Sequence, residues 1–139
     1  SSVFETLQLA ALRGVDVRIL LPEKSDSKLV YLASFAFLEA AGRSGIKIYR
    51  YQSGFLHQKV VLVDDHIAAI GTANLDNRSL YLNFEIMAVV VDAGFAAQVE
   101  TMLEIDFELS RQATVADLQT RSWLFRWAVR VARLFDPIL

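Results

Sequence analysis

Short strand-like and longer helix-like apolar patterns alternate along this chain of 139 residues. Apolar residues that recur every three or four positions indicate helices, and short runs rich in valine and isoleucine indicate strands. We predict strands at 15–21, 46–53, 55–64, 67–70 and 84–91, and helices at 4–12, 28–41 and 95–110. Because sheets and helices must bury their apolar faces against each other, this order predicts an α/β fold, a mixed β-sheet flanked by helices.

Glycine and proline mark several of the predicted boundaries. Gly14 is placed to cap the end of the first helix, and Pro22 to stop the strand that follows. Gly42 and Gly45 are expected to end the second helix. The sequence Asp64-Asp65-His66 lies between two apolar runs and predicts a tight turn, so that the strands on either side pair as a hairpin.

Composition narrows the kind of site that the chain can hold. It has no cysteine and two histidines, which excludes thiolate chemistry and disulfides and argues against a histidine-based metal site. We therefore expect neither a metal nor a cofactor. The formal net charge of −2 argues against electrostatic capture of nucleic acid. With 54% hydrophobic residues the chain is apolar for a soluble domain, so we expect part of its surface to contact a membrane or another domain.

Neither a membrane-spanning segment nor a signal peptide is predicted. No apolar run reaches the roughly 18–20 residues that a membrane-spanning helix requires. The chain begins at Ser1 in a helix-like pattern, without an initiator methionine and without the pattern of a secretory leader. We therefore expect it to be a piece of a longer protein.

A cluster of polar residues surrounds the predicted hairpin. His57 and Lys59 are two positions apart on one strand, so their side chains point to the same face of the sheet. A histidine can attack or donate a proton near neutral pH, and a lysine can bind a non-bridging phosphate oxygen. Thr72 and Asn74 follow a strand end, where they and the Gly71 amide can donate to the same oxygens. These groups predict a site that binds and attacks a phosphodiester without a metal.

Two carboxylates are spaced to support this site. Glu85 lies within the predicted apolar strand 84–91, so we expect it to be buried and to need a partner. The ring N–H of His57 is the obvious partner, and the pair would fix the tautomer and raise the basicity of the imidazole. Asp64 ends a strand at the turn, so we interpret it as a structural residue that caps the turn or pairs with a nearby base. Each residue also has an ordinary interpretation as a packed histidine, an exposed lysine or a turn residue.

The spacing of the cluster, H-x-K-x4-D-x6-G-T-x-N from His57, resembles the HKD motif of the phospholipase D superfamily. Thr72 stands where that family usually has serine, and it keeps the hydroxyl group. The likeness extends beyond the motif and is to the second half of bacterial cardiolipin synthases. It covers nearly the whole chain and is carried by the segments 14–20, 51–57, 73–80, 82–85 and 134–139. The resemblance implies a phospholipase D-like domain over most of the chain.

The resemblance also implies a reaction and a set of residues. In the family two HKD histidines face each other; one attacks phosphorus to give a phosphohistidine, and the other protonates the leaving alcohol. The implied activity is that of a phosphatidyltransferase that makes cardiolipin from two phosphatidylglycerol molecules at the cytoplasmic face of the bacterial inner membrane. The catalytic residues carried over are His57, Lys59, Asp64, Asn74 and Glu85, and those expected to bind the substrate phosphate are Lys59, Gly71, Thr72 and Asn74.

Only one HKD motif is present, because His66 has no lysine two positions further on. The other half of the family's site would have to come from a missing N-terminal segment of the same protein or from a second copy of this chain. We therefore expect the chain alone to be inactive unless two copies dimerise. Its expected partners are phosphatidylglycerol, that second half and a membrane surface.

The end of the chain has a different pattern, and we divide the sequence into a catalytic half-domain at 1–112 and an amphipathic helical tail at 113–139. Thr114 and Asp117 form a capping-box pattern that predicts the start of a helix. One face of that helix would carry Trp123, Leu124, Trp127, Val131, Leu134 and Phe135, with a ridge of Arg126, Arg130 and Arg133 beside it. This composition is typical of a helix at a membrane interface, and the alternative is a helix packed on its own domain with a solvated arginine edge.

Two other functions stay open on the sequence alone. One is a homodimeric phosphodiesterase or nuclease with a single HKD motif, against which the acidic balance and the tail both argue. The other is a non-catalytic module that binds a membrane or a partner. The intact His57, Lys59, Asn74 and Glu85 argue against this second alternative.

Overall fold

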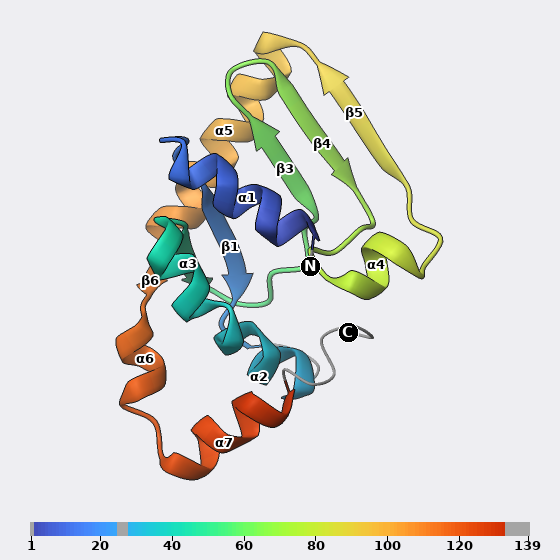
Figure 1. Ribbon diagram of the computed structural model, residues 1–139. Helices are drawn as coiled ribbons and strands as arrows, with labels where there is room; N and C mark the ends of the chain where they lie inside the picture. Colours follow the sequence, from blue (N-terminus) through green and yellow to red (C-terminus); the bar gives the residue numbers. More distant parts are fainter. Residues whose placement is uncertain (1, 25–27, 133–139) are drawn as a thin grey trace.

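The computed structural model describes residues 2–24 and 28–132. Helices and strands alternate along them (Figure 1). In chain order the elements are α1 (Ser2–Leu12), β1 (Arg18–Pro22), α2 (Lys28–Ala36), α3 (Leu38–Ser44), β2 (Lys47–Tyr51), β3 (Val60–Val63), β4 (Ile67–Gly71), α4 (Asn77–Tyr81), β5 (Met87–Val91), α5 (Ala93–Glu108), β6 (Ser110–Ala113), α6 (Val115–Gln119) and α7 (Trp123–Ala132).

The strands form two three-stranded sheets. In the first, with the order β1-β2-β6, β1 runs parallel to β2 and β6 runs antiparallel to it, so this sheet is mixed. In the second, with the order β3-β4-β5, neighbouring strands are antiparallel. Helix α5 contacts strands of both sheets and so links them (Figure 1). The predicted α/β fold with helices around the strands is confirmed, with the strands divided over two sheets.

The main apolar core lies between the first sheet and the helices packed on it. Its side chains come from elements far apart in the sequence, and removing them together from water drives the assembly. The buried members are Phe4, Val17, Phe35, Leu38, Ala41, Ile46, Ile48, Ala113 and Val129. This core fixes β2, and with it the start of the segment that leads to His57.

One charged side chain, Arg50 of β2, is buried beside this core. Its Nη1 donates to the Pro22 carbonyl oxygen at 3.3 Å, and its Nη2 donates to Ser34 Oγ at 2.7 Å. The guanidinium carbon also lies over the rings of Tyr31 and Phe35, 5.4 and 4.7 Å from their centroids. Burial lowers the pKa of Arg50. The side chain tolerates this site because hydrogen bonds and stacked rings replace part of its hydration.

The second sheet has a covered face and an open face. Ala68 of β4 is fully buried, and α5 is the helix that contacts this sheet. Side chains alternate between the two faces of a strand. Val61, Val63, Val89 and Val91 are exposed together on the other side, which we call the open face of the second sheet. A strip of exposed β-branched residues of this kind marks a surface that another part of a protein covers.

Several boundaries differ from the prediction. β1 ends at Pro22, as predicted, but begins at Arg18 rather than at Val15. Proline is tolerated as the last residue of β1 because β1 is an edge strand. Gly42 lies inside α3, so the prediction that it ends the helix is wrong. That helix ends at Gly45, whose φ of 83° is the left-handed conformation that glycine favours. The predicted single helix is interrupted at Phe37, and the sequence does not predict the short elements α4 and β6.

The tail contains two described helices instead of one. The capping box at the start of α6 is confirmed, with Asp117 Oδ2 accepting from the Thr114 N–H at 2.6 Å. The helical structure is interrupted between Gln119 and Trp123, where α7 begins. Helix α7 packs against α2. The predicted domain boundary after residue 112 falls inside β6, which pairs with β2. The predicted helical positions Arg133, Leu134 and Phe135 lie outside the described residues.

Candidate active site

Three segments come together where β3 and β5 begin and β4 ends. The Gly71 N–H donates to the Lys59 carbonyl oxygen at 3.1 Å, and the Thr72 N–H donates to the Ile86 carbonyl oxygen at 3.0 Å. These bonds continue the pairing of the second sheet past the ends of its strands. Both strands begin later than predicted, β3 at Val60 instead of residue 55 and β5 at Met87 instead of residue 84. The site is therefore built on extended segments that adjoin the sheet.

His57 and Lys59 project from the extended segment before β3. The His57 ring is exposed and stacks on Phe55, with centroids 5.5 Å apart. Lys59 Nζ donates to the His57 carbonyl oxygen at 2.8 Å, which holds the ammonium group next to this residue. Gln58 Nε2 donates to Asp106 Oδ2 of α5 at 2.6 Å and anchors the segment. We did not predict this anchor from the sequence. The position of Gln58 between His57 and Lys59 does indicate that its side chain faces the opposite side, because side chains alternate along an extended segment.

Glu85 is not the buried strand residue that the sequence predicts. It precedes β5 and is partly exposed, and its neighbour Phe84 is fully exposed. The apolar neighbours of Glu85 in the sequence do not bury its carboxylate, because Glu85 lies before β5 and outside the sheet. In the described part of the chain, no hydrogen bond joins Glu85 to the His57 ring, so the expected pairing is not formed in this arrangement.

The carboxylate of Glu85 interacts with polar groups of the neighbouring loop instead. Asn83 Nδ2 donates to Glu85 Oε1 at 3.2 Å. A hydrogen bond from Thr72, followed by the one from Asn83, holds the pKa of the Glu85 carboxyl below its usual value. A hydrogen bond with Ser79 and the charge of Lys59 act in the same direction. The arrangement therefore keeps an ionised carboxylate beside the cation of the motif.

The lowered pKa of Glu85 leads to a testable prediction. Because the folded-state pKa lies below the reference value of 4.5, the ionised carboxylate stabilises the fold above that pH, and this contribution is lost as the pH falls through the folded pKa. Thr72→Val removes the largest cause and is expected to raise the pKa of Glu85. Carbon-detected NMR titration of the carboxyl group measures both values.

Thr101→Val is the matched control for that titration. The Thr101 hydroxyl donates to the Ala97 carbonyl oxygen within α5 at 2.9 Å, so its loss should leave the titration of Glu85 unchanged. A Glu85 midpoint that is the same in Thr72→Val and in the unmodified chain would show that the Thr72 hydroxyl is not the cause of the shift.

Gly71 has a steric role in place of the expected role as a phosphate donor, because its N–H is already bonded to Lys59. A Cβ on Gly71 would overlap the Ile86 carbonyl oxygen and would lie 2.8 Å from Met87 Cα. No side chain has room at this position. Glycine therefore lets the segment before β5 approach the end of β4.

Thr72 and Asn74 lie in the loop between β4 and α4. Thr72 Oγ1 accepts from the Ile86 N–H at 3.0 Å, so this hydroxyl joins the loop to the start of β5. Asn74 is exposed. The loop is ordered by α4, where Asp76 Oδ1 accepts from the Ser79 N–H at 2.6 Å and caps the helix. That Thr72 and Asn74 bind a phosphate stays a prediction.

Asp64 is not brought to the other residues of the motif. It lies in the turn between β3 and β4, where its φ of 49° is the left-handed conformation that aspartate tolerates in turns. It lies five positions after Lys59 along extended chain, a distance of roughly 16 Å. This position fits the interpretation of Asp64 as a turn residue rather than a group that contacts substrate.

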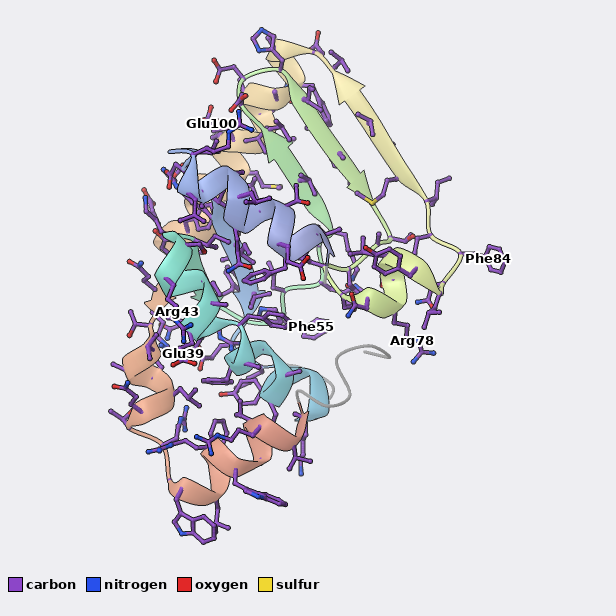
Figure 2. The ribbon with its side chains drawn as sticks, viewed as in Figure 1. Glu39, Arg43, Phe55, Arg78, Phe84 and Glu100 are labelled. Carbon is purple, nitrogen blue, oxygen red and sulfur yellow. The ribbon has the colours of Figure 1, made fainter. Side chains whose placement is uncertain are left out.

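Exposed apolar side chains lie on the same segments as the cluster, and we call them the apolar rim. Figure 2 shows Phe84 projecting outward beyond α4, with Arg78 of that helix below it. Such a patch on a domain marks a surface that binds a ligand or another part of a protein. The members of the rim are Phe55, Leu75, Tyr81, Leu82, Phe84 and Ile86.

The described residues, 2–24 and 28–132, hold neither a cluster of metal ligands nor a helix that could span a membrane. No group of three or more histidine, aspartate or glutamate side chains there is placed to hold a metal ion. None of the helices in the same part of the chain is long and apolar enough to cross a membrane.

Comparisons with known proteins give a consistent result. The family model described as "Cardiolipin synthase, PLD-like domain" matches residues 1–107. Cardiolipin synthase A of Pseudomonas putida is 56% identical over 138 residues, which cover 99% of this chain and 29% of that protein. Cardiolipin synthase A of Pseudomonas aeruginosa is 55% identical over 138 residues, which cover 99% of this chain and 28% of that protein. The chain thus spans less than a third of the length of these relatives.

Two solved structures share the fold. The phospholipase D family member Nuc from Salmonella typhimurium has a TM-score of 0.71 and 23% identity, over 81% of this chain and 73% of that one. The phosphatidylserine synthase of Haemophilus influenzae has a TM-score of 0.69 and 17% identity, over 99% of this chain and 38% of that one. Because the family model covers most of the residues, and the HKD cluster lies within it, the chain belongs to the phospholipase D-like domain family of cardiolipin synthases.

Proposed function

We propose that this chain is one catalytic half of a cardiolipin synthase, which joins two phosphatidylglycerol molecules into cardiolipin and releases glycerol. The observation that carries the proposal is the exposed imidazole of His57, a residue whose main-chain carbonyl oxygen accepts from the Lys59 ammonium group. This pair lies in a chain of the cardiolipin synthase family. The complete enzyme would act at the cytoplasmic face of the bacterial inner membrane, where its lipid substrate lies.

The reaction needs two histidines, and His57 takes one of the two parts. One imidazole attacks the phosphorus of the first phosphatidylglycerol, the bond from phosphorus to the headgroup glycerol oxygen breaks, and the other histidine protonates the leaving glycerol. That second histidine then accepts a proton from a glycerol hydroxyl of another phosphatidylglycerol, whose oxygen attacks the phosphohistidine. The phosphorus–nitrogen bond breaks, cardiolipin forms and the first imidazole is restored.

The other residues of the cluster act on the charge of the phosphate. Lys59 has three donors, so it can keep its bond to the His57 carbonyl while it donates to a non-bridging oxygen. Thr72 and Asn74, both exposed, would supply further donors as negative charge develops. Glu85 would position Thr72 and limit the motion of the lysine through its charge.

A second HKD half is the partner that this mechanism requires. The apolar rim and the open face of the second sheet both expose apolar side chains that a partner would bury. The missing histidine would come from an N-terminal part of the same protein or from a second copy of this chain. The net charge of −2 argues against nucleic acid as the substrate.

The test compares the 139-residue chain with the complete protein that contains it, each purified and mixed with phosphatidylglycerol vesicles. Cardiolipin and glycerol are measured by mass spectrometry. We expect product from the complete protein and none from the monomeric chain. A complete protein that makes no cardiolipin would contradict the proposal. Hydrolysis of plasmid DNA by a dimer of the chain would instead support the single-motif nuclease.

A further inference from the structure

We propose that the outer face of α7 is a docking surface for an anionic lipid bilayer. This outer face consists of Trp123, Leu124 and Trp127, which are 71%, 58% and 60% exposed. Residues three and four positions apart are neighbours on an α-helix, so Trp127 adjoins both Leu124 and Trp123 and the three form one patch. The inference rests on the proposed function only in that the substrate is a membrane lipid, and docking can be measured without turnover.

The opposite face of α7 already supplies the packing that holds the helix on the domain. Val129 and Ala132 are buried, and the Phe125 ring meets the Phe35 ring edge-on with centroids 5.2 Å apart. The alternative expected from the sequence, a helix packed on its own domain, therefore holds for this face. It does not account for the two indoles, because a helix with a satisfied core face gains nothing from further apolar groups in water.

The charge around the outer face is positive. Helix α7 carries Arg126 and Arg130, both exposed, and its ten residues include no acidic one. Just before the helix, the Arg121 guanidinium lies over the Phe125 ring, 5.3 Å from its centroid. Between positions 118 and 135 the sequence has four arginines and no acidic residue, although the whole chain has a net charge of −2. This local excess of positive charge complements an anionic surface.

Tryptophan beside arginine suits the headgroup region of a bilayer. An indole can lie below the phosphates with its N–H at their level, while a guanidinium binds the phosphate oxygens. Burial of apolar side chains and attraction to anionic lipid then add, and stable surface binding needs both. A stable protein interface would need a much larger area than three side chains provide. The chemistry of the patch thus favours lipid over a protein partner.

The outer face lies apart from the candidate active site. Figure 1 shows α6 and α7 at the end of the molecule opposite the sheet formed by β3, β4 and β5. The second HKD half can therefore cover the apolar rim while α7 rests on lipid. Docking through α7 would hold the enzyme on the surface that contains its substrate.

Trp123 and Trp127 are the two tryptophans of the chain, so its intrinsic tryptophan emission reports on α7 alone. We expect this emission to shift to shorter wavelength when vesicles of phosphatidylglycerol and phosphatidylcholine in equal parts are added. Lipids brominated on their acyl chains should quench it. Pure phosphatidylcholine vesicles should bind at least about 10-fold more weakly, and added salt should weaken binding to the mixed vesicles. An unchanged emission spectrum with the mixed vesicles overturns the proposal.

Variants of the aromatic residues separate α7 from the apolar rim. The double variant Trp123→Ala, Trp127→Ala should co-sediment with the mixed vesicles at least about 10-fold more weakly than the unmodified chain. Phe84→Ala removes an even more exposed ring from the apolar rim and should leave binding unchanged. Loss of binding in Phe84→Ala but not in the tryptophan variant would overturn the proposal. Circular dichroism and thermal unfolding verify that the exposed substitutions leave the fold intact.

Variants of the arginines test the electrostatic part. Replacing Arg126 and Arg130 by glutamine should weaken binding by about 5-fold for each charge removed. The double variant Arg13→Gln, Arg43→Gln changes the net charge equally at two other exposed positions, just after α1 and in α3, and should have little effect. Equal weakening in both would show that net charge, rather than α7, controls binding.

The proposed function and the docking surface can fail separately. If the complete protein makes no cardiolipin while the chain binds vesicles through α7, only the proposed function fails. If the complete protein makes cardiolipin while the tryptophan variant binds vesicles as well as the unmodified chain, only the docking proposal fails.

Discussion

Replacing His57 with asparagine is expected to lower the rate of cardiolipin formation by the complete enzyme about 10³-fold or more. The imidazole is exposed, and the main-chain carbonyl oxygen of the same residue holds the Lys59 ammonium group. Loss of the ring therefore removes either the nucleophile or the general acid of the reaction. The ring stacks on Phe55 at the surface, so the substitution should disturb folding little. The measurement is cardiolipin formed per enzyme in phosphatidylglycerol vesicles.

His66 provides the matched control for this experiment. It is the other histidine of the chain and is exposed in the β3–β4 turn, away from the cluster. His66→Asn should leave the rate unchanged, and an equal loss in both variants would contradict the role assigned to His57.

A phosphodiester with a p-nitrophenyl leaving group needs no general acid. His57→Asn should therefore keep activity toward that substrate only if His57 is the acid rather than the nucleophile.

Gly71→Ala is expected to destabilise the chain by about 2–3 kcal/mol and to disrupt the cluster. The added Cβ would overlap the Ile86 carbonyl oxygen and crowd Met87 Cα, and both are backbone atoms that cannot rotate away. Relief requires the start of β5 to move, which breaks the bonds between Thr72 and Ile86 and displaces Glu85. Urea unfolding measures the stability, and cardiolipin formation by the complete enzyme measures the loss of function.

Gly42→Ala is the control for the glycine substitution. A Cβ at Gly42 would lie 3.6 Å from Val115 Cγ2, which is an ordinary contact, and the position lies inside α3. Alanine is favoured over glycine within a helix by up to about 1 kcal/mol, so this variant should be as stable as the unmodified chain or more stable. If Gly71→Ala unfolds at the same urea concentration as Gly42→Ala, the close approach at Gly71 is not required.

The residues that the sequence predicted best are those whose signal is local. The β3–β4 turn depends on Asp64 and its neighbours, and the start of α6 depends on a capping box between Thr114 and Asp117. Each of these uses contacts within a few residues, so the sequence contains the whole of the information. The α/β class follows from the alternation of apolar patterns for the same reason.

The features that the sequence did not predict depend on tertiary contacts. Phe84 and Ile86 read as strand interior but are exposed, because apolar composition does not tell a core residue from one that a partner covers. The prediction that Glu85 is buried is wrong for the same reason, because it depended on these two neighbours. The anchor from Gln58 to Asp106 joins positions 48 residues apart. The alternation of the strand indicates that Gln58 faces away from His57 and Lys59, but no local pattern identifies Asp106 as its partner.

Arg50 limits how β2 can align with its neighbours. A slip of this strand by one residue would turn each of its side chains to the opposite face of the sheet. The guanidinium would lose its carbonyl and hydroxyl partners, Ile48 would leave the core, and the Lys47 ammonium would take its place. Misalignment would thus leave charged groups without partners and would reduce the apolar area that is buried. The buried guanidinium of Arg50 therefore favours one register of β2 in the first sheet. As a result, the segment that carries His57 always leaves β2 at the same point.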